Sequence, residues 1–175
     1  SNNKGINKSS TQFVFILNPD TVFKNDTLKK IFDEAKLIDD FAIISPINSD
    51  PNHPNYKSSN KLFSENIIEA NSVDGFAMLI NKKKFEENNF FDEKIFLFLE
   101  NDDLCKRTKK LGNNIYVIKN ALIDHKGFSS STKIDKDKLE HLRNWHWMWS
   151  KFYFNKKHYG FFQAFIYILP SLLSS

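Results

Sequence analysis

The stretch Phe13-Val14-Phe15-Ile16-Leu17-Asn18-Pro19-Asp20 decides the fold that we expect for this chain. It opens with a continuous apolar run, which is typical of a strand covered on both faces, and the Asn-Pro-Asp turn ends that run. A helix is predicted next, capped by Asn25 or Asp26, because apolar residues recur with near-helical spacing as far as Ile38. The sequence therefore predicts a strand-to-helix unit in a parallel or mixed sheet.

The same alternation continues along the chain. Further strands are predicted at 41–45, 73–80, 115–118 and 121–123, with helices at 82–88 and from the acidic cluster at 100–103 to Gly112. The Pro-, Asn- and Ser-rich stretch 46–60 is expected to be a long loop. This alternation predicts a three-layer α/β/α domain with a mixed, mostly parallel sheet over residues 1–133.

Composition limits the possible functions. The chain has 175 residues, of which 41% are hydrophobic, and this is enough for one sizeable core. The formal net charge of +4 is spread without a long basic block, so we expect no nucleic-acid binding. The single cysteine, Cys105, excludes an internal disulfide framework and Cys-rich zinc sites. It indicates a reducing compartment, so a cytoplasmic location is predicted.

Residues 134–175 are predicted to form a helical extension. Aromatic and aliphatic residues recur at helical steps from Leu139 to Tyr153 and give the helix an aromatic face. The apolar stretch 160–174 is interrupted at Pro170 and falls short of the roughly 20 residues that a spanning helix needs. Two alternatives are open for residues 143–174: peripheral contact with the inner face of the cell membrane, or packing against protein.

Asp20 and His125 are candidate metal ligands. Asp20 follows the first strand at its carboxyl end, which is the edge of open α/β sheets where ligands bind. A carboxylate on this Pro-stiffened turn can ligate a divalent cation that bridges a pyrophosphate, whereas the alternative is a plain strand-to-helix turn. His125 ends the last predicted strand, where an imidazole is a plausible ligand.

The cluster Glu100-Asn101-Asp102-Asp103 stands at a predicted helix start. Capping and the helix dipole explain part of this cluster but not all four side chains. The Phe-rich approach would place Glu100 beside an apolar wall, which raises a carboxyl pKa and suits a general base. Asp103 and Arg107 stand at i and i+4, so they can pair along the helix.

In their order, these segments resemble the motifs of the family-2 inverting glycosyltransferases, especially the bacterial rhamnosyltransferase-like members. The resemblance covers residues 4–132. Residues 16–21 look like the family's variant of the metal-binding DxD motif, and residues 73–80 look like its mid-domain strand. Residues 91–107 are similar to its acidic catalytic segment, and His125-Lys126-Gly127-Phe128-Ser129 is similar to its closing His-x-Gly-x-Ser.

The resemblance implies a GT-A-like fold and transfer of a sugar, with inversion, from a UDP- or dTDP-type donor to a glycan or lipid-linked acceptor in bacterial surface polysaccharide synthesis. It implies Mn²⁺ or Mg²⁺ as cofactor, with Asp20 and His125 as metal or pyrophosphate ligands. The base would be Glu100 or Asp102. The residues implied at the substrate are Asn18, Asp74, Gly75, Asn101, Asp103 and Arg107.

Two departures from the family pattern leave alternatives open. The family usually has Glu-Asp where this chain has Glu100-Asn101, and an amide cannot accept the acceptor's proton. Either Glu100, which we favour, or Asp102 serves instead, or the enzyme is impaired. The polar start at residues 1–11 leads directly into a strand, so we expect the N-terminal nucleotide-binding strands to be missing and donor binding to be weak. A non-catalytic sugar- or partner-binding remnant and a metal-dependent hydrolase are the competing hypotheses.

Overall fold

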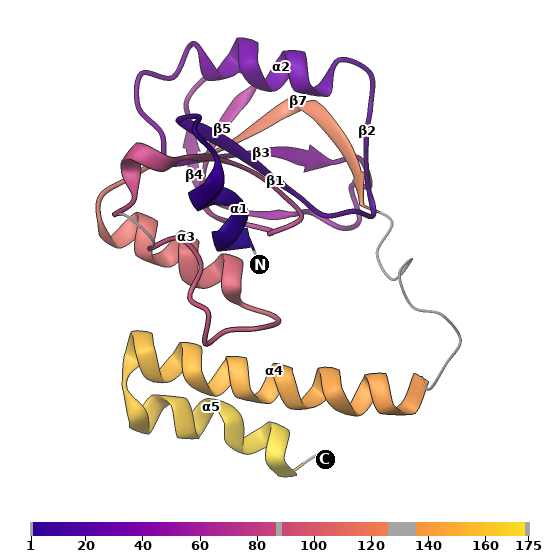
Figure 1. Ribbon diagram of the computed structural model, residues 1–175, viewed down its shortest axis with the longest axis vertical. Coiled ribbons are helices and arrows are strands. Elements are labelled where there is room, and N and C mark those ends of the chain that lie inside the picture. The colour runs from indigo at the N-terminus through magenta and orange to yellow at the C-terminus, as the bar shows by residue number, and fades with distance from the viewer. Residues whose placement is uncertain (1, 87–88, 126–135, 174–175) are drawn as a thin grey trace.

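The computed structural model describes residues 2–86, 89–125 and 136–173. It places a seven-stranded mixed sheet among helices and adds a pair of long helices at the C-terminal end (Figure 1). The strands are β1 (Phe13–Leu17), β2 (Thr21–Phe23), β3 (Ile43–Asn48), β4 (Tyr56–Leu62), β5 (Ile67–Val73), β6 (Ala77–Asn81) and β7 (Ile115–His125). The helices are α1 (Asn2–Lys8), α2 (Thr27–Ala35), the short 3₁₀ turn η1 (Lys82–Lys84), α3 (Glu100–Lys110), α4 (Lys136–Tyr159) and α5 (Phe161–Leu173).

The α/β class is confirmed, but the expectation of a mostly parallel sheet is wrong. The strand order is β1-β6-β3-β7-β5-β4, with β2 paired to β7, and the parallel pair is β3 with β7. The other pairs are antiparallel. All five residues of β6 are buried although both of its neighbours run antiparallel to it. A continuous apolar run therefore does not report strand direction. It does not ensure two-sided burial either, because in β1, at the end of the strand order, Ile16 is the one buried residue and the expected cover on both faces is not found.

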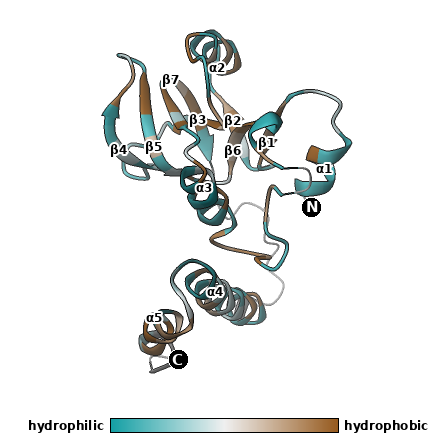
Figure 2. Cartoon of the chain, turned by 90° about the vertical axis from the view of Figure 1, so that its left-hand side faces the viewer, coloured by the Kyte–Doolittle hydropathy of each residue, from teal (hydrophilic) through white to brown (hydrophobic). Residues whose placement is uncertain are grey.

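Helices cover both faces of the sheet, as Figure 2 shows with α2 on one side and α3 on the other. One face packs Ile6 of α1 and Leu104 and Cys105 of α3 against Met78 and other strand residues. The opposite face packs Ile31 of α2 against strand residues that include Leu79. Because Met78 and Leu79 are consecutive, their side chains enter opposite layers, as the pleat of a strand requires.

Two predicted boundaries are corrected. Stretch 46–60 is not one long loop, because β3 continues to Asn48 and β4 begins at Tyr56. The predicted strand 73–80 is broken at Asp74-Gly75, so that β5 ends at Val73 and β6 begins at Ala77. The turn between β5 and β6 lies beside the start of α3, since a methyl group added at Gly75 would lie 3.3 Å from Asn101 Cβ.

The C-terminal extension is helical, as predicted, and it contacts the rest of the chain. Helices α4 and α5 pack side by side beyond α3 (Figure 1). Ser150 Oγ donates to the Leu97 carbonyl over 2.7 Å, and Trp149 Nε1 donates to the Lys94 carbonyl over 3.1 Å. Among the described residues, no helix is both long and apolar enough to cross a membrane. The predicted boundary at 133/134 lies outside the described residues.

Candidate functional site

The predicted metal ligands Asp20 and His125 lie next to each other. Strand β2 pairs antiparallel with β7 so that Thr21 faces His125, and this register brings Asp20 Oδ1 to 3.4 Å from His125 Nε2. Both side chains remain partly accessible. The His125 ring stacks on Phe76, with ring centroids 4.4 Å apart, and Phe76 comes directly after the β5–β6 turn. The imidazole of His125 therefore packs on the Phe76 ring, and its Nε2 atom lies toward the Asp20 carboxylate.

Asn18 holds the turn that carries Asp20. Its backbone N–H donates to the Phe76 carbonyl over 2.8 Å, and its own carbonyl accepts from Thr21 Oγ1 over 2.6 Å. The residue itself is exposed at the end of β1. Asn18, Phe76, Asp20 and His125 thus form one contiguous patch at this end of the sheet.

The donor set fits a divalent cation only in part. Carboxylate oxygen and imidazole nitrogen are both ligands of Mn²⁺, and Mg²⁺ is commonly held by one or two protein ligands together with substrate phosphates. Over the described residues, no group of three or more His, Cys, Asp and Glu side chains could hold a metal ion. Asp20 and His125 therefore suit a cation that a diphosphate also binds, and do not form a complete protein cage.

Asp74 and Gly75 form the turn between this patch and the start of α3. Burial of its carboxyl raises the pKa of Asp74, the charge of Asp102 raises it further, and Lys57 and His125 oppose the shift. These electrostatic interactions place Asp74 between the His125 side and the Asp102 side of the site. A methyl group at Gly75 would lie 3.8 Å from Glu100 Oε1, an ordinary van der Waals separation, so the turn lies directly beside that carboxylate.

Glu100 has the features expected of a general base. Burial raises the pKa of its carboxyl, and the nearby charge of Asp102 raises it further. Its Oε2 atom is buried and has no hydrogen-bond partner among the described residues. An unpaired buried carboxylate oxygen is costly, so it is prepared to accept a proton or a hydrogen bond from a ligand.

Asn101 has a structural contact at the position where the resemblance expects the base. Its Nδ2 donates to the Val73 carbonyl over 2.9 Å and so connects the first turn of α3 to the end of β5. The carbonyl needs a donor, which an amide provides and a carboxylate does not. Asn101 thus shapes the site by holding α3 against the β5–β6 turn.

Asp102 is paired with a residue that the sequence did not single out. Lys57 Nζ on β4 lies 3.4 Å from Asp102 Oδ1. This ammonium is paired with one carboxylate oxygen of Asp102, whereas Glu100 Oε2 has no hydrogen-bond partner among the described residues. Of the two acids left open by the sequence, Glu100 is therefore the better candidate for proton transfer.

Asp103 and Arg107 are engaged in contacts within the protein. Asp103 is fully buried, and its carboxylate is bound by Arg107 Nε, Lys157 Nζ and His158 Nε2, each at 2.8 Å. Arg107 also donates to the Asn89 carbonyl over 3.0 Å and to the Phe90 carbonyl. These contacts fasten α3 to α4 and to the preceding loop, so the implied substrate-binding role does not match their placement.

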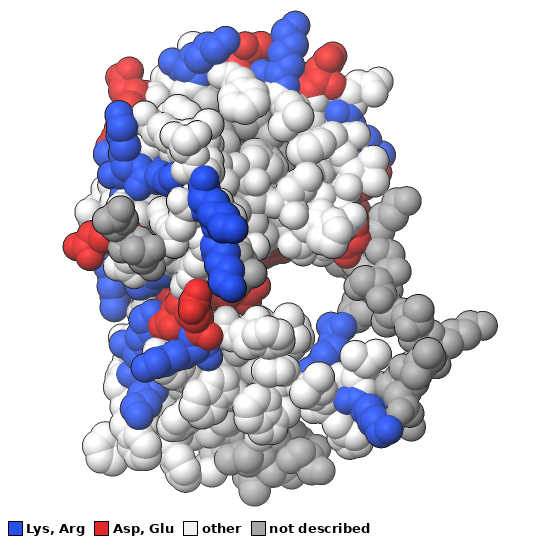
Figure 3. Space-filling model, in the orientation of Figure 1, with Lys and Arg blue, Asp and Glu red and all other residues white. Residues whose placement is uncertain are grey.

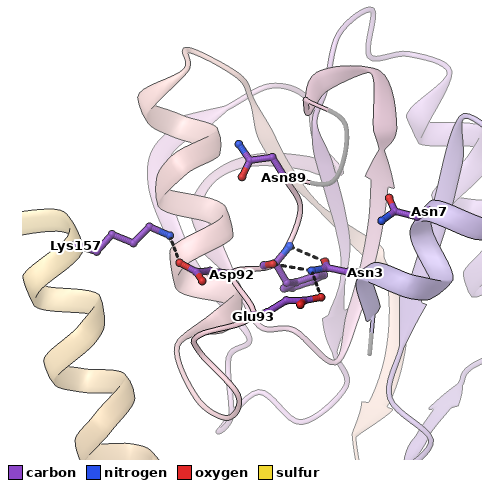
Figure 4. A pocket seen from close by; sticks show the side chains of 7 residues that line it. Asn3, Asn7, Asn89, Asp92, Glu93 and Lys157 are labelled. Atoms are coloured by element: carbon purple, nitrogen blue, oxygen red, sulfur yellow. Dashed lines mark hydrogen bonds and ion pairs between the residues drawn. The ribbon is translucent and has the colours of Figure 1, made fainter.

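Two adjacent cavities lie on the Glu100 side of α3. One, of about 480 Å³, is lined by Glu100 together with Phe96 and residues of α1. The other, of about 460 Å³, is shown in Figure 4, where Asn3 of α1 hydrogen-bonds to Glu93 and Lys157 reaches Asp92 from α4. In Figure 3, acidic side chains gather beside the junction between the sheet domain and α4–α5. The cavities thus combine carboxylate and amide groups with an aromatic wall.

Most predicted site residues converge on residues 74–76. The Asp20–His125 pair lies on one side of this turn and Glu100, Asn101 and Asp102 lie on the other. Lys57 and Phe76 were missed as members of the site; Lys57 sits in a stretch that was expected to be a loop. Of the predicted closing motif, residues 126–129 lie outside the described residues.

The chain matches no protein-family model and no curated protein. Among solved structures, it is similar to the crystal structure of A197 from STIV with a TM-score of 0.45 and 12% sequence identity. The superposition covers 67% of this chain and 59% of that chain, so the chain spans less than two thirds of that protein. A likeness this weak carries no conclusion about family or activity.

Proposed function

We propose that the chain is a GT-A-like domain of an inverting glycosyltransferase that moves a sugar from a nucleotide-diphosphate donor to a hydroxyl of a glycan or lipid-linked acceptor. The observation that carries the proposal is the position of the β5–β6 turn. Phe76 stacks on His125 of the candidate metal pair, and Gly75 lies beside the Glu100 carboxylate. The candidate diphosphate site and the candidate base thus adjoin two consecutive residues, Phe76 and Gly75.

In this proposal, Glu100 takes the proton of the acceptor hydroxyl. The acceptor oxygen forms a bond to the anomeric carbon while the bond from that carbon to the diphosphate oxygen breaks, and the configuration inverts. Asp20 and His125 would hold Mn²⁺ or Mg²⁺, which would supply positive charge beside the diphosphate leaving group. Asp74, beside them, faces the sugar or the acceptor.

A non-catalytic sugar- or partner-binding remnant is the second candidate, and Asn101 favours it. The amide contributes a structural hydrogen bond to Val73 where the resemblance expects a base. The two candidates differ in turnover: the first transfers sugar and the second only binds it.

Calorimetric titration with UDP and dTDP, with and without Mn²⁺, tests the diphosphate site. We expect Mn²⁺-dependent binding that is lost in Asp20→Ala and His125→Ala. Asp33→Ala and His53→Ala make the same changes at exposed side chains on α2 and in the β3–β4 connection, and should bind as the unchanged chain does. No binding by a folded chain under any condition would favour the non-catalytic remnant.

We further propose that α4 and α5 contact the inner face of the cell membrane. Phe162 and Ile166, which share one face of α5, are 84% and 67% exposed, and Lys156 lies at the end of α4 that adjoins α5. Apolar side chains beside a lysine suit an interfacial helix. Sedimentation with anionic vesicles should recover the chain, and Phe162→Ser with Ile166→Ser should abolish recovery.

A further inference from the structure

A separate cavity lies on the Asp102 side of α3. Its volume is about 440 Å³, and β4, β5, α3 and the end of α4 all contribute to it. It is lined by Lys57, Asn71, Ser72, Leu99, Asp102, Lys106, Lys109, Phe154 and Tyr159. Since Asp102 of the lining lies two residues after Glu100 on α3, this cavity adjoins the candidate reaction site.

The lining is rich in positive charge. Lys57, Lys106 and Lys109 contribute ammonium groups, whereas Asp102 is the lining residue with a carboxylate. Lys57 lies 3.4 Å from Asp102, and Lys109 lies 2.6 Å from Glu69 at the cavity's edge. With Glu69 included, the lysines still exceed the carboxylates, so an anion would gain by binding here.

Lys106 has aromatic partners and, within the described part of the chain, no carboxylate partner. Its Nζ lies 3.8 Å from the centroid of the Tyr159 ring and donates to the Tyr159 hydroxyl. It also lies 5.8 Å from the Phe154 ring centroid. These contacts position the ammonium while leaving its charge uncompensated, and the two rings add an apolar wall beside it.

We propose that this cavity binds a phosphate group of the substrate that is glycosylated, with Lys57 and Lys106 as its principal contacts and the rings of Phe154 and Tyr159 against the adjoining organic group. Lysines act as point charges for phosphate and do not require a planar partner. The location beside Asp102 places the rest of this ligand toward Glu100. The assignment to the acceptor rests on the proposed glycosyltransferase function, whereas phosphate binding itself does not.

The test is calorimetric titration of the whole chain with inorganic pyrophosphate in EDTA, so that no cation bridges the ligand to Asp20 and His125. Lys57→Met and Lys106→Met should each weaken binding about tenfold, because each removes one charge-assisted contact. Together they should abolish it. Lys29→Met removes the same charge from α2, on the opposite face of the sheet, and should leave the affinity unchanged.

Several results would overturn the proposal: no pyrophosphate binding by the unchanged chain, equal affinity in the double variant, or an equal loss in Lys29→Met. Mn²⁺-dependent UDP binding should persist in Lys106→Met, and EDTA-resistant pyrophosphate binding should persist in Asp20→Ala. A failure of one site is thus distinguishable from a failure of the other. Vesicles of phosphatidylcholine with and without phosphatidate then separate the two sources of phosphate, since a lysine-dependent gain with phosphatidate indicates a lipid headgroup and no gain indicates a soluble phosphate ester.

Discussion

The side-chain amide of Asn101 donates a hydrogen bond of 2.9 Å to the carbonyl of Val73, and so joins the first turn of α3 to the end of β5. In Asn101→Asp this donor becomes an acceptor that faces another acceptor. We expect the free energy of unfolding at neutral pH to fall by about 1–3 kcal/mol, the usual cost of an unsatisfied buried polar group. Urea denaturation measures it. Asn71→Asp is the control, because its similar bond to the Ser58 carbonyl is exposed and should cost less.

Gly75→Ala should destabilise the same junction. The added methyl group would lie 3.3 Å from Asn101 Cβ, closer than ordinary packing allows, so α3 or the turn must shift. We expect a loss of about 1–3 kcal/mol in the free energy of unfolding. Gly5→Ala in α1 meets nothing within 4 Å and should instead stabilise the chain by about 0.5–1 kcal/mol. Equal changes in the two variants would contradict the close approach at Gly75.

Glu100→Gln should raise stability at neutral pH while removing any base function. Burial raises the pKa of Glu100 in the folded chain, so the folded state holds its proton more tightly than the unfolded state does. The contribution of Glu100 to stability is therefore present at low pH and is lost as the pH rises through the folded pKa. The difference in the free energy of unfolding between Glu100→Gln and the unchanged chain should narrow as the pH falls toward 4.5, the ordinary pKa of a glutamate carboxyl.

Denaturation of both forms across this pH range tests the Glu100 prediction. Glu65→Gln, at an exposed position between β4 and β5, controls for the loss of one negative charge. A constant difference between Glu100→Gln and the unchanged chain at all pH values would argue against a perturbed carboxyl.

Asp103→Asn should loosen α4 from the sheet domain. The substitution leaves Arg107, Lys157 and His158 around a neutral group, and breaking a buried ion cluster costs about 3–5 kcal/mol. Burial alone would raise the pKa of Asp103, but hydrogen bonds from Lys157 and Arg107 lower it, so this stabilisation is lost as the pH falls. In Asp103→Asn, amide hydrogen exchange at the end of α4 should accelerate. Asp33→Asn is the control: Asp33 forms an exposed pair with Lys36, so its substitution should change the free energy of unfolding by less than about 1 kcal/mol.

The sequence predicted the position of elements that have a clear apolar pattern. The run of β1 and the helical spacing of α2 stand where they were expected. Strand β4 was taken for a loop because its residues are mostly polar and exposed, and its pairing with β5 is visible only in three dimensions. Strand direction also escaped prediction, since two-sided burial gives the same apolar pattern in β6 as in a parallel strand.

The candidate site, like the fold, could be predicted from the sequence only in part. The resemblance implied a shared ligand role for Asp20 and His125, and the two side chains do lie 3.4 Å apart. The sequence could not assign different roles to Asp102 and Asp103, because the two residues are adjacent in the acidic cluster. Their partners differ: Lys57 on β4 binds Asp102, and the end of α4 binds Asp103. Only the tertiary fold assigns one acid to a cavity and its neighbour to the interior.

The fully buried Cys105 packs between α3 and the sheet, one turn beyond Asn101. Burial raises the pKa of this thiol to about 12, so in the folded chain it is neither accessible nor appreciably ionised. The chain has no other cysteine. The rate at which a thiol reagent modifies the protein consequently measures how often α3 detaches from the sheet. The reporting thiol lies on the helix on which both proposed sites depend.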